Sequence, residues 1–586
     1  MSEVTFIKGK DQSLENSIAF MQTTLIKQGF DINEVKWLNS VANIYSLHIH
    51  DRACPGLFTN GKGASRKATL ASALGEFLER LSTNYFFSDY YLEPALKDPS
   101  LSGMNDWLYY PNEKSFALSD FKQCLNADLW SIYDPHQELQ ADQLLSFNDN
   151  SERIRAIEMR HAQTDEVIYV PMNLLSNLYA SNGLSAGNNQ QEAAVQGLSE
   201  IFERWVKNKI LKENICLPEI PDQVIARFPS IQRSLQDLRD QGLEVSVRDA
   251  SLGGQFPVMN VTLFDPKQGR CFASFGAHPL FEVALERTLT ESLQGRHLGF
   301  LDGFQVPSFD QQAIAEDENL ENHFIDSSGL INARFIADQA DFEFVDWNWD
   351  LTTEQQWQWL VELAKEQGFD VYIAHYAQYN FHTCRIIAPG MSEVYPMDEL
   401  LVKNQNDGRK LRQALGQFAI NQQPGLVLAL LDEIGFSDHQ GVASLIGLMP
   451  DAGCVWNNIK IIDLRFWLEV YAKDFDAAYQ SLQVCKAYVD PEKPMAVVYE
   501  AMQFALDIEL DSLDYAAYRS GMKKLFGEQI IDKVQAHLNG EQCAWGLALG
   551  PAAFEQSHRH QALWQVYQRA HQAKISQIRV SQIKAE

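Results

Sequence analysis

Hydrophobic and polar positions follow two different patterns along this chain, and the change falls near residue 410. Before that point, helical periodicity is interrupted by short β-rich runs. The helical patterns lie near residues 66–86, 189–211, 279–298 and 353–367, and the β-rich runs lie at residues 45–50, 167–170, 242–247, 257–263 and 369–374. Because strands and helices mix without a regular βαβ order, residues 1–410 are predicted to form an α+β domain, with a mixed α/β core as the alternative.

Residues 411–586 show helical patterns with almost no strand signal. These patterns lie at residues 425–434, 461–487, 495–508, 513–525, 528–538 and 551–574. The phrase Asp476-Ala-Ala-Tyr479 returns as Tyr515-Ala-Ala-Tyr518, and small residues beside aromatic ones are typical of stacked helix pairs. We therefore expect an all-α, tetratricopeptide-like domain. The alternative is a helical domain without repeats. We also expect the chain to form a homodimer through this domain, with recruitment of another protein as the open alternative.

Bulk composition limits the class of protein. The chain has 586 residues, too many for one ordinary core. No apolar run approaches the roughly 20 residues of a membrane helix, and the first residues lack the features of a signal peptide. The eight cysteines are scattered without a CxxC pair, which favours reduced, mostly buried thiols. We expect a cytoplasmic protein with no membrane partner.

The charge is strongly acidic. Acidic residues outnumber basic ones by 77 to 48, which gives a net charge of −29. Such a surface repels nucleic acid, so no direct nucleic-acid partner is expected. A nucleotide remains compatible with this charge, because metal ions can reverse the local sign.

A first candidate for chemistry lies on the helical pattern near residue 76. At about 100° per residue, Ser72, Glu76, Glu79 and Arg80 fall within an arc of roughly 100°. Two carboxylates one turn apart repel each other, and apolar neighbours make this face harder to solvate. Taken alone, the pattern also fits a surface stripe with a Glu–Arg ion pair.

A second helix repeats the Glu-x-x-Glu-Arg phrase as Glu200, Glu203 and Arg204, with Glu192 and Gln196 on the same stripe. The segment just before it contains Ser185, Asn188 and Asn189. Because this segment contains glycine and opens a helix, it offers backbone N–H groups and side-chain amides to an anion or a base edge.

A third helix adds Arg287 and Glu291, one turn apart. Six carboxylates cannot share a buried site unless they are protonated or neutralised by cations. Magnesium prefers oxygen ligands and commonly bridges substrate phosphates, and arginines bind phosphate oxygens in bidentate fashion. The Gly61-Lys62-Gly63 segment lacks the Walker A spacing, so this pattern predicts ATP bound through metals and arginines without a P-loop.

These motifs resemble the ATP-binding signatures of the YcaO family. The matching segments are Ser72-x3-Glu76-x2-Glu79-Arg80, Ser185-x3-Asn189-x2-Glu192, Arg287-x3-Glu291, Gly61-Lys62-Gly63 and Ala388-Pro-Gly-Met391. One departure is Asn189, where glutamine is frequent. The resemblance covers roughly residues 1–400, and the helical remainder is similar to that of enterobacterial family members. It implies an α+β YcaO-type domain with ATP and Mg2+ as ligands.

The resemblance also implies residue roles. The metal ligands would be Glu76, Glu79, Glu192, Glu200, Glu203 and Glu291. The ATP contacts would be Lys10, Ser17, Ser72, Arg80, Ser185, Asn188, Asn189, Arg204 and Arg287, with Arg204 and Arg287 on the phosphates. No residue is assigned a catalytic role.

Members of this family activate a peptide amide with ATP, and the product is an azoline or a thioamide. Azoline-forming members commonly end in a proline-rich tail, whereas this sequence ends Ile578-Arg-Val-Ser-Gln-Ile-Lys-Ala-Glu586. Enterobacterial members are associated with RimO-dependent β-methylthiolation of a small-subunit ribosomal protein. Because no CxxxCxxC motif is present, we do not expect the radical methylthiotransferase itself, and the resemblance implies an accessory factor that hydrolyses ATP. The alternatives are a peptide cyclodehydratase and a non-catalytic scaffold with structural ATP.

Overall fold

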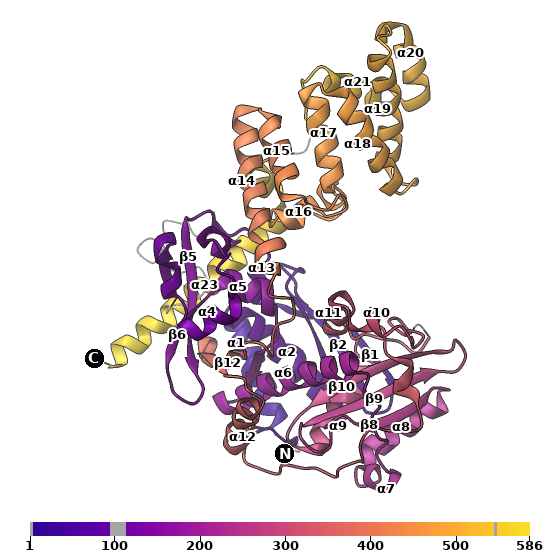
Figure 1. The fold of residues 1–586 in the computed structure, drawn as a ribbon. Coiled ribbons are helices and arrows are strands. Elements are labelled where there is room, and N and C mark those ends of the chain that lie inside the picture. The colour runs from indigo at the N-terminus through magenta and orange to yellow at the C-terminus, as the bar shows by residue number, and fades with distance from the viewer. Residues whose placement is uncertain (1–3, 94–112, 300, 544–547, 586) are drawn as a thin grey trace.

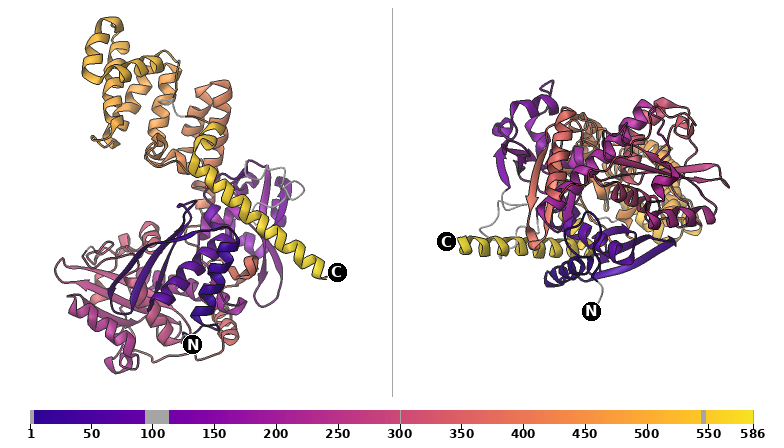
Figure 2. Two further views of the ribbon diagram at one scale, coloured as in Figure 1. Left: turned by 180° about the vertical axis from the view of Figure 1, so that it is seen from behind. Right: turned by 90° about the horizontal axis from the view of Figure 1, so that it is seen from below.

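The chain forms a mixed body of strands and helices, an arm of helices, and one long helix that runs back from the arm along the body (Figures 1 and 2). The computed structural model describes residues 4–93, 113–299, 301–543 and 548–585, with side chains described as far as residue 576. We call residues 4–402 the body and residues 406–556 the arm.

The described residues of the body form three antiparallel sheets. The first has the order β1-β2-β3 and consists of β1 (Ile32–Val41), β2 (Ile44–Asp51) and β3 (Phe58–Gly63). The second has the order β10-β9-β8 and consists of β8 (Glu244–Asp249), β9 (Val258–Asp265) and β10 (Arg270–Ala277).

The third sheet has six strands in the order β4-β5-β11-β12-β7, with β6 paired to β5. Its strands are β4 (Lys114–Ala117), β5 (Arg153–His161), β6 (Val167–Pro171), β7 (Leu184–Gly187), β11 (Tyr372–Tyr376) and β12 (His382–Ile387). Since β7 ends just before a long helix, this sheet fixes the point at which that helix begins.

Three helices carry the predicted motifs: α2 (Arg66–Ser82), α6 (Gln190–Glu213) and α9 (Phe281–Ser292). The α2 helix contacts β3 and β2, α6 contacts β7, β12 and β10, and α9 contacts β10, β9 and β3. The remaining body helices are α1 (Leu14–Lys27), α4 (Ala127–Tyr133), α5 (Met172–Leu174), α7 (Asp222–Ile225), α8 (Pro229–Asp240), α10 (Gln311–Ala315), α11 (Asp317–Ile325), α12 (Thr353–Glu366) and α13 (Glu399–Val402).

Two glycines allow β3 to lie against α2. A Cβ atom on Gly61 would come within 2.2 Å of Thr69 O, and one on Gly63 within 2.9 Å of Thr69 N. The Ser65 side chain caps the helix by accepting a hydrogen bond from Ala68 N at 3.2 Å. The residue between the two glycines, Lys62, is thereby held close to α2.

The arm consists of helices with their own apolar cores. They are α14 (Asn406–Asn421), α15 (Pro424–Ile434), α16 (Val442–Leu445), α17 (Ile461–Ala472), α18 (Phe475–Tyr488), α19 (Pro494–Leu510), α20 (Tyr515–Phe526), α21 (Glu528–Leu538) and α22 (Pro551–Gln556). Successive helices from α17 to α21 pack on one another around buried residues that include Phe466, Trp467 and Tyr499.

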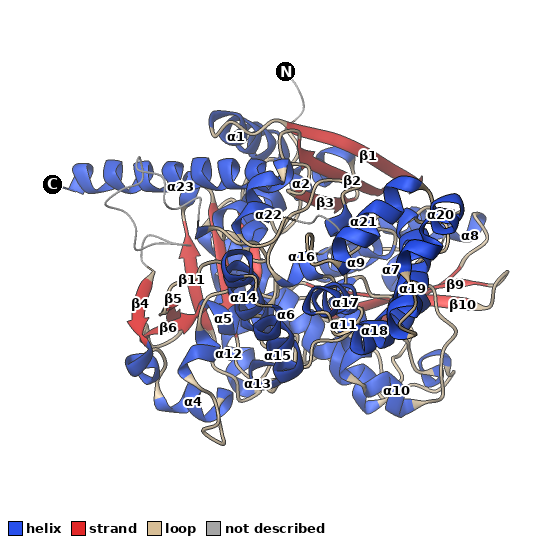
Figure 3. Cartoon of the chain, turned by 90° about the horizontal axis from the view of Figure 1, so that it is seen from above, coloured by secondary structure: helices blue, strands red, loops and turns tan. Residues whose placement is uncertain are grey.

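The last helix, α23 (His558–Ala585), belongs to the core of the body as well as to the chain's helical region. Figure 3 shows it passing beside α2 and α22. Its residues Leu563, Val566, Tyr567 and Ala570 are at most 2% exposed and are part of the cluster that contains Phe87. The body core therefore depends on residues from both ends of the sequence.

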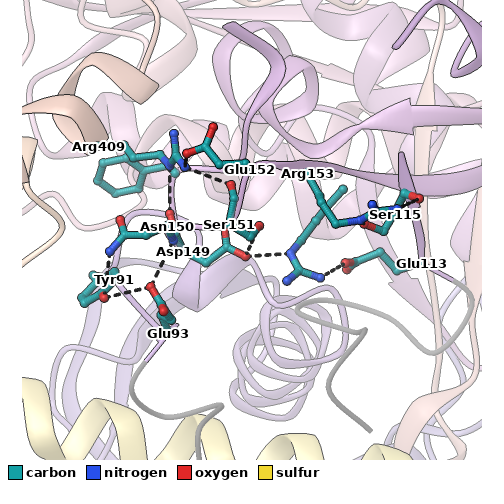
Figure 4. A network of polar contacts seen from close by, with 12 residues as sticks. Tyr91, Glu93, Glu113, Ser115, Asp149, Asn150, Ser151, Glu152, Arg153 and Arg409 are labelled. Carbon is teal, nitrogen blue, oxygen red and sulfur yellow. Dashed lines mark hydrogen bonds and ion pairs between the residues drawn. The ribbon is translucent and has the colours of Figure 1, made fainter. Parts of the chain in front are cut away.

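A polar network joins arm and body (Figure 4). The buried guanidinium of Arg409 on α14 donates to Asp149 O at 3.1 Å, and it also contacts Glu152 at 3.0 Å. Arg412, one turn later, donates to Phe147 O at 2.6 Å. The expected boundary between residues 410 and 411 falls inside α14, so this helix is itself the junction.

The predicted α+β fold with a helical C-terminal region is confirmed. Two of the predicted helices are divided in the structure. The pattern at residues 461–487 breaks where Lys473 adopts a left-handed φ of 62° and Asp474 caps the next helix. The pattern at residues 551–574 breaks between α22 and α23 at Ser557, whose hydroxyl donates to Met449 O at 2.6 Å.

Other expectations concern the cysteines, the repeat and the membrane. All eight cysteines are free thiols, and six of them are buried. Within the described ranges, no helix combines the length and apolar character that crossing a membrane requires. Both echoed phrases begin a helix, α18 and α20, each capped by an aspartate. The tetratricopeptide-like character, the homodimer and the cytoplasmic location remain predictions.

Candidate functional site

Lys62 lies among acidic side chains from all three motif helices. Its Nζ forms an ion pair with Glu291 of α9, and its electrostatic neighbours include Glu76 of α2 and Glu203 of α6. Burial lowers the pKa of Lys62 to about 8, against the opposing effect of Glu203 and the other carboxylates. Four of the six carboxylates predicted to converge, Glu76, Glu200, Glu203 and Glu291, therefore lie near this ammonium group. We call Lys62, Glu76, Glu79, Glu200, Glu203 and Glu291 the central cluster.

On α2, one arginine serves two carboxylates. Arg80 Nη2 lies 3.3 Å from Glu76 Oε1, and Arg80 Nη1 lies 3.4 Å from Glu79 Oε1. Glu79 is 8% exposed. Burial raises the pKa of Glu79 to about 8 despite the attraction of Arg80, and nearby Glu76 and Glu200 raise it further. Without a further cation, Glu79 therefore holds its proton near neutral pH.

The α6 helix supplies Glu200, Glu203 and two arginine contacts. Arg204 lies 2.7 Å from Glu200 Oε1 and donates to Asn182 Oδ1 at 2.7 Å. Arg287 of α9 donates to Gln196 Oε1 on α6 at 2.7 Å. Both predicted phosphate-binding arginines thus border the same face of α6, on either side of Glu200.

Glu192 lies in a second group at the start of α6, with Lys10, Ser17, Asn188 and Asn189. Lys10 Nζ donates to Glu192 Oε1 at 2.9 Å, and Asn188 Nδ2 donates to the same carboxylate at 3.0 Å. Ser17 Oγ donates to Asn188 Oδ1 at 2.7 Å, while Asn189 caps the helix by accepting from Glu192 N at 2.8 Å. We call these five residues the Glu192 cluster.

The two clusters are separate along α6. Glu192 precedes Glu200 by two turns, which is about 12 Å of helix rise. Burial raises the pKa of Glu192, but Lys10 and the hydrogen bonds outweigh that effect, so the pKa is lowered overall. Unlike Glu79, Glu192 is ionised and already paired with a cation.

Two predicted serines lie in different surroundings. Ser72 Oγ accepts a hydrogen bond from Lys62 N at 3.4 Å and so borders the central cluster. Ser185 is 1% exposed; its hydroxyl donates to Ala193 O at 2.7 Å and lies 3.1 Å from Cys384 Sγ. Ser185 therefore faces the first turn of α6 and is closed off by it.

Lys207 is a buried member of the α6 stripe that the sequence analysis missed. It is 4% exposed and its Nζ donates to His323 O at 2.7 Å. Burial lowers the pKa of Lys207 to about 8, while Glu203 opposes this shift. Helical spacing could have found it, because seven residues separate it from Glu200 and put both on one face.

The donor set fits magnesium bound together with phosphate. Among the residues that the structure describes, no group of three or more His, Cys, Asp or Glu side chains is arranged to hold a metal by itself. In the central cluster, Glu291 pairs with Lys62, Glu76 and Glu79 contact Arg80, and Glu200 pairs with Arg204. Magnesium commonly uses one or two carboxylates plus substrate phosphates, so these oxygens suit a metal that arrives with a nucleotide.

A cavity of about 600 Å3 opens beside the Glu192 cluster. Its lining includes Lys10 and Asp11, and Asp11 N donates to Glu192 at 3.1 Å. Phe281 and Trp347 form an apolar part of the wall, and Arg227, paired with Asp346 at 2.6 Å, forms a polar part. The cavity thus adjoins the Glu192 cluster at the start of α6.

Known proteins match this chain over nearly its whole length. A family model described as a YcaO cyclodehydratase that binds ATP and Mg2+ matches residues 60–392, and one for the YcaO cyclodehydratase C-terminal domain matches residues 408–576. The chain is 40% identical, over 587 residues, to the ribosomal protein S12 methylthiotransferase accessory factor YcaO of Escherichia coli strain K12, which covers 98% of this chain and 99% of that protein.

Two further proteins are similar to this chain, one over nearly its whole length and one over part of it. An uncharacterized protein of Haemophilus influenzae is 40% identical over 590 residues, covering 98% of this chain and 99% of that protein. The solved structure of YcaO from Methanopyrus kandleri bound with AMPPCP and Mg2+ has a TM-score of 0.42 and 18% identity, covering 67% of this chain and 95% of that one.

Proposed function

The chain belongs to the YcaO family, and from this premise we propose that it is an accessory factor in the RimO-dependent β-methylthiolation of a small-subunit ribosomal protein. Its domain is of the ATP- and Mg2+-binding kind. In this proposal the chain hydrolyses ATP to activate an amide. Support for the pathway comes from the 40% identity to a protein named as an S12 methylthiotransferase accessory factor.

The main observation in support of the nucleotide site is the position of Lys62. One ammonium group faces carboxylates from α2, α6 and α9. Like charges gathered from three helices cost folding energy unless cations neutralise them. The lysine ammonium supplies one positive charge to these carboxylates. A divalent ion that also binds phosphate supplies two, and it prefers the oxygen ligands that carboxylates and phosphates offer.

We assign roles to the residues of the central cluster and to the two arginines beside it. Glu76, Glu79, Glu200, Glu203 and Glu291 would hold magnesium at the central cluster. Arg204 and Arg287 would donate to phosphate oxygens, since the planar guanidinium matches that geometry. When bound, Mg–ATP supplies the phosphoryl group and offsets charge that grows during its transfer.

The Glu192 cluster would receive the other end of the nucleotide. Lys10, Ser17 and Asn188 offer donors and acceptors there. A metal role for Glu192 requires Lys10 to leave its carboxylate, so it stays a prediction, as do the ATP contacts of Ser72, Arg80, Ser185 and Asn189.

The binding part of the proposal is tested by isothermal titration calorimetry with Mg2+ and a non-hydrolysable ATP analogue. Wild-type protein should bind the analogue only with Mg2+. Glu203→Gln should weaken binding by roughly 100-fold, because it removes a metal ligand. The matched control is Glu213→Gln on the same helix, where Glu213 is 52% exposed and pairs with Lys209. Equal affinity of wild type and Glu203→Gln contradicts the site.

The catalytic part is tested by phosphate release in the presence of RimO and its ribosomal substrate. Turnover that depends on both partners supports the accessory role. The family's description as cyclodehydratases keeps azoline formation as a second candidate, and mass loss of one water from an added peptide would favour it. Binding without turnover under any of these conditions favours a scaffold with structural ATP.

We also propose that the chain forms a homodimer through the arm. Large apolar side chains remain exposed there, among them Ile420 at 86%, Leu426 at 54% and Leu525 at 68%. Light scattering of the full chain should give twice the monomer mass. A single-chain mass at micromolar concentration contradicts the dimer without affecting the nucleotide site.

A further inference from the structure

The end of helix α2 is capped by a lysine from the last helix of the chain. Lys574 on α23 is 2% exposed. Its Nζ donates to Leu81 O at 3.0 Å, to Ser82 O at 3.0 Å and to Asn84 Oδ1 at 2.6 Å. Leu81 and Ser82 are the last two residues of α2, and nearly 500 residues separate them from Lys574. No local sequence signal accounts for this contact.

The geometry suits an ammonium group at a helix end. The last carbonyl groups of a helix have no partner within it, and the helix dipole makes that end negative. A lysine ammonium has three N–H donors, and three acceptors surround Lys574. Because the site is buried, water cannot take over these hydrogen bonds, so removal of the donors would leave polar groups unsatisfied.

Several contacts hold α23 in place at this position. Trp564 Nε1 donates to Tyr91 O at 2.8 Å, and the ring of Tyr567 meets that of Phe87 at 5.0 Å. The Arg569 guanidinium lies 4.8 Å above the Phe30 ring. Lys574 is thus presented to α2 by a helix that is fixed on the body over several turns.

The last turn of α2, which Lys574 caps, also contains two residues of the proposed site, Glu79 and Arg80. Glu79 lies two residues before Leu81, and Arg80 immediately before it. Their carboxylate and guanidinium positions relative to α6 depend on how the last turn of α2 is held. A helix end without its cap frays, and fraying here would move Glu79 away from Glu200.

We propose that Lys574 is a positioning residue for the magnesium and ATP site, and that α23 makes the C-terminal region a required part of that site. This inference rests on the proposed function, since it concerns the same carboxylates. It goes beyond it by assigning a role to a residue that touches neither metal nor nucleotide.

The test is calorimetry of the full chain with Mg2+ and the same ATP analogue. Lys574→Met keeps the length of the side chain and removes its donors. We expect the Mg2+ concentration for half-maximal binding to rise about tenfold. Hydrogen exchange should speed up in the peptide that covers residues 78–90 and stay unchanged in α6.

A stability-matched control separates positioning from general weakening. Val566→Ala removes a buried methyl pair from the same helix, where Val566 is 2% exposed, without touching the cap. It should lower the melting temperature but leave the Mg2+ dependence unchanged. If Lys574→Met does not fold, Asn84→Gly removes the side-chain acceptor while tolerating the left-handed φ of 54° at this position, and a roughly threefold weakening is expected.

The outcomes are distinct. A folded Lys574→Met protein with wild-type Mg2+ dependence overturns the inference and leaves the proposed function standing. Equal weakening by Val566→Ala also overturns it, because the effect is then not specific to the cap. Wild-type protein that binds no Mg–ATP overturns both.

Discussion

Buried carboxylates meet different surroundings in the arm and in the body. In the arm, Asp463 on α17 accepts from Tyr499 Oη at 2.5 Å and from Lys460 N at 2.8 Å. In the body, Glu79 on α2 lies near two further carboxylates, Glu76 and Glu200, and shares Arg80 with one of them. Asp463 is thus satisfied by hydrogen-bond donors, whereas Glu79 lies among further acids.

The difference separates a structural role from a binding role. A carboxylate that accepts good hydrogen bonds stabilises the fold, whereas carboxylates that repel each other lower stability until a cation arrives. The body therefore holds an acid, Glu79, whose pKa is raised by burial and by neighbouring carboxylates at the proposed ligand site. Perturbed acids at functional sites are expected on this ground.

The two regions are nevertheless one folding unit at their junction, and the largest expected effect tests this. Tyr567 on α23 is 1% exposed and packs on Phe87 of the body. Tyr567→Ala should lower the free energy of unfolding of the body by about 3–5 kcal/mol, because it leaves a large cavity. Chemical denaturation followed by tryptophan fluorescence and circular dichroism measures the change.

The control for this substitution is a tyrosine of the arm. Tyr488 is 52% exposed and contacts Lys460, so Tyr488→Ala should cost less than about 1 kcal/mol. If Tyr567→Ala costs as little free energy of unfolding as Tyr488→Ala, α23 does not belong to the body core. Body and arm would then be more independent of each other than we describe.

The sequence alone predicted the helices that carry the site but missed other amphipathic helices and alternating strands, among them α1, α8, α14 and β5. The helices with Glu76, Glu200 and Glu291 were found from helical spacing, and the match to the YcaO family, its α+β fold and its ligands is confirmed. Strand β3 was missed, because Phe58-Thr-Asn-Gly-Lys-Gly63 has no alternation of apolar and polar residues.

Long-range contacts were beyond the reach of periodicity. Nothing in the sequence around Lys574 indicates that it meets the end of α2, since that contact depends on the path of the whole chain. Lys62 entered only as part of a family landmark, and its position among the carboxylates follows from the two flanking glycines. Assignment of individual ligands to the ATP site stays a prediction.

The second prediction concerns the junction itself. Arg412 on α14 is buried and donates to Phe147 O at 2.6 Å and to Ile446 O at 3.1 Å. Burial lowers the pKa of Arg412 to about 10. Arg412→Met removes the donors and leaves buried carbonyls unpaired, so we expect a loss of about 2 kcal/mol in the free energy of unfolding.

Calorimetry should also show a change in cooperativity. With the junction weakened, the single transition expected of coupled regions should separate into two. The matched control is Arg465→Met, because Arg465 pairs with the 67% exposed Asp432 on the arm surface and should contribute under about 1 kcal/mol. Two transitions already present in the wild type would contradict the coupling.

The smallest expected effect compares the buried glutamates directly. Burial raises the pKa of Glu79 to about 8, and burial likewise raises the pKa of Glu469 on α17, which is 7% exposed. An acid whose pKa is higher in the folded than in the unfolded state binds more protons when folded. Metal-free protein should therefore lose stability as pH rises from about 4.5 to 8 through Glu79.

Glutamine substitution removes that dependence in both regions but affects the ligand in only one. At pH 8.5 without metal, Glu79→Gln should raise stability by about 1 kcal/mol, or roughly 2 °C in melting temperature, with no gain at pH 5, and Glu469→Gln should change stability in the same direction. Added Mg2+ and ATP should then raise the melting temperature of wild type and of Glu469→Gln but not of Glu79→Gln, since ligand that binds only the folded state stabilises it. Melting curves at the two pH values, with and without ligand, measure all three proteins. If Mg2+ and ATP still raise the melting temperature of Glu79→Gln, Glu79 is buried for a structural reason only, like Glu469. The difference between the acids of body and arm would then not indicate a ligand site.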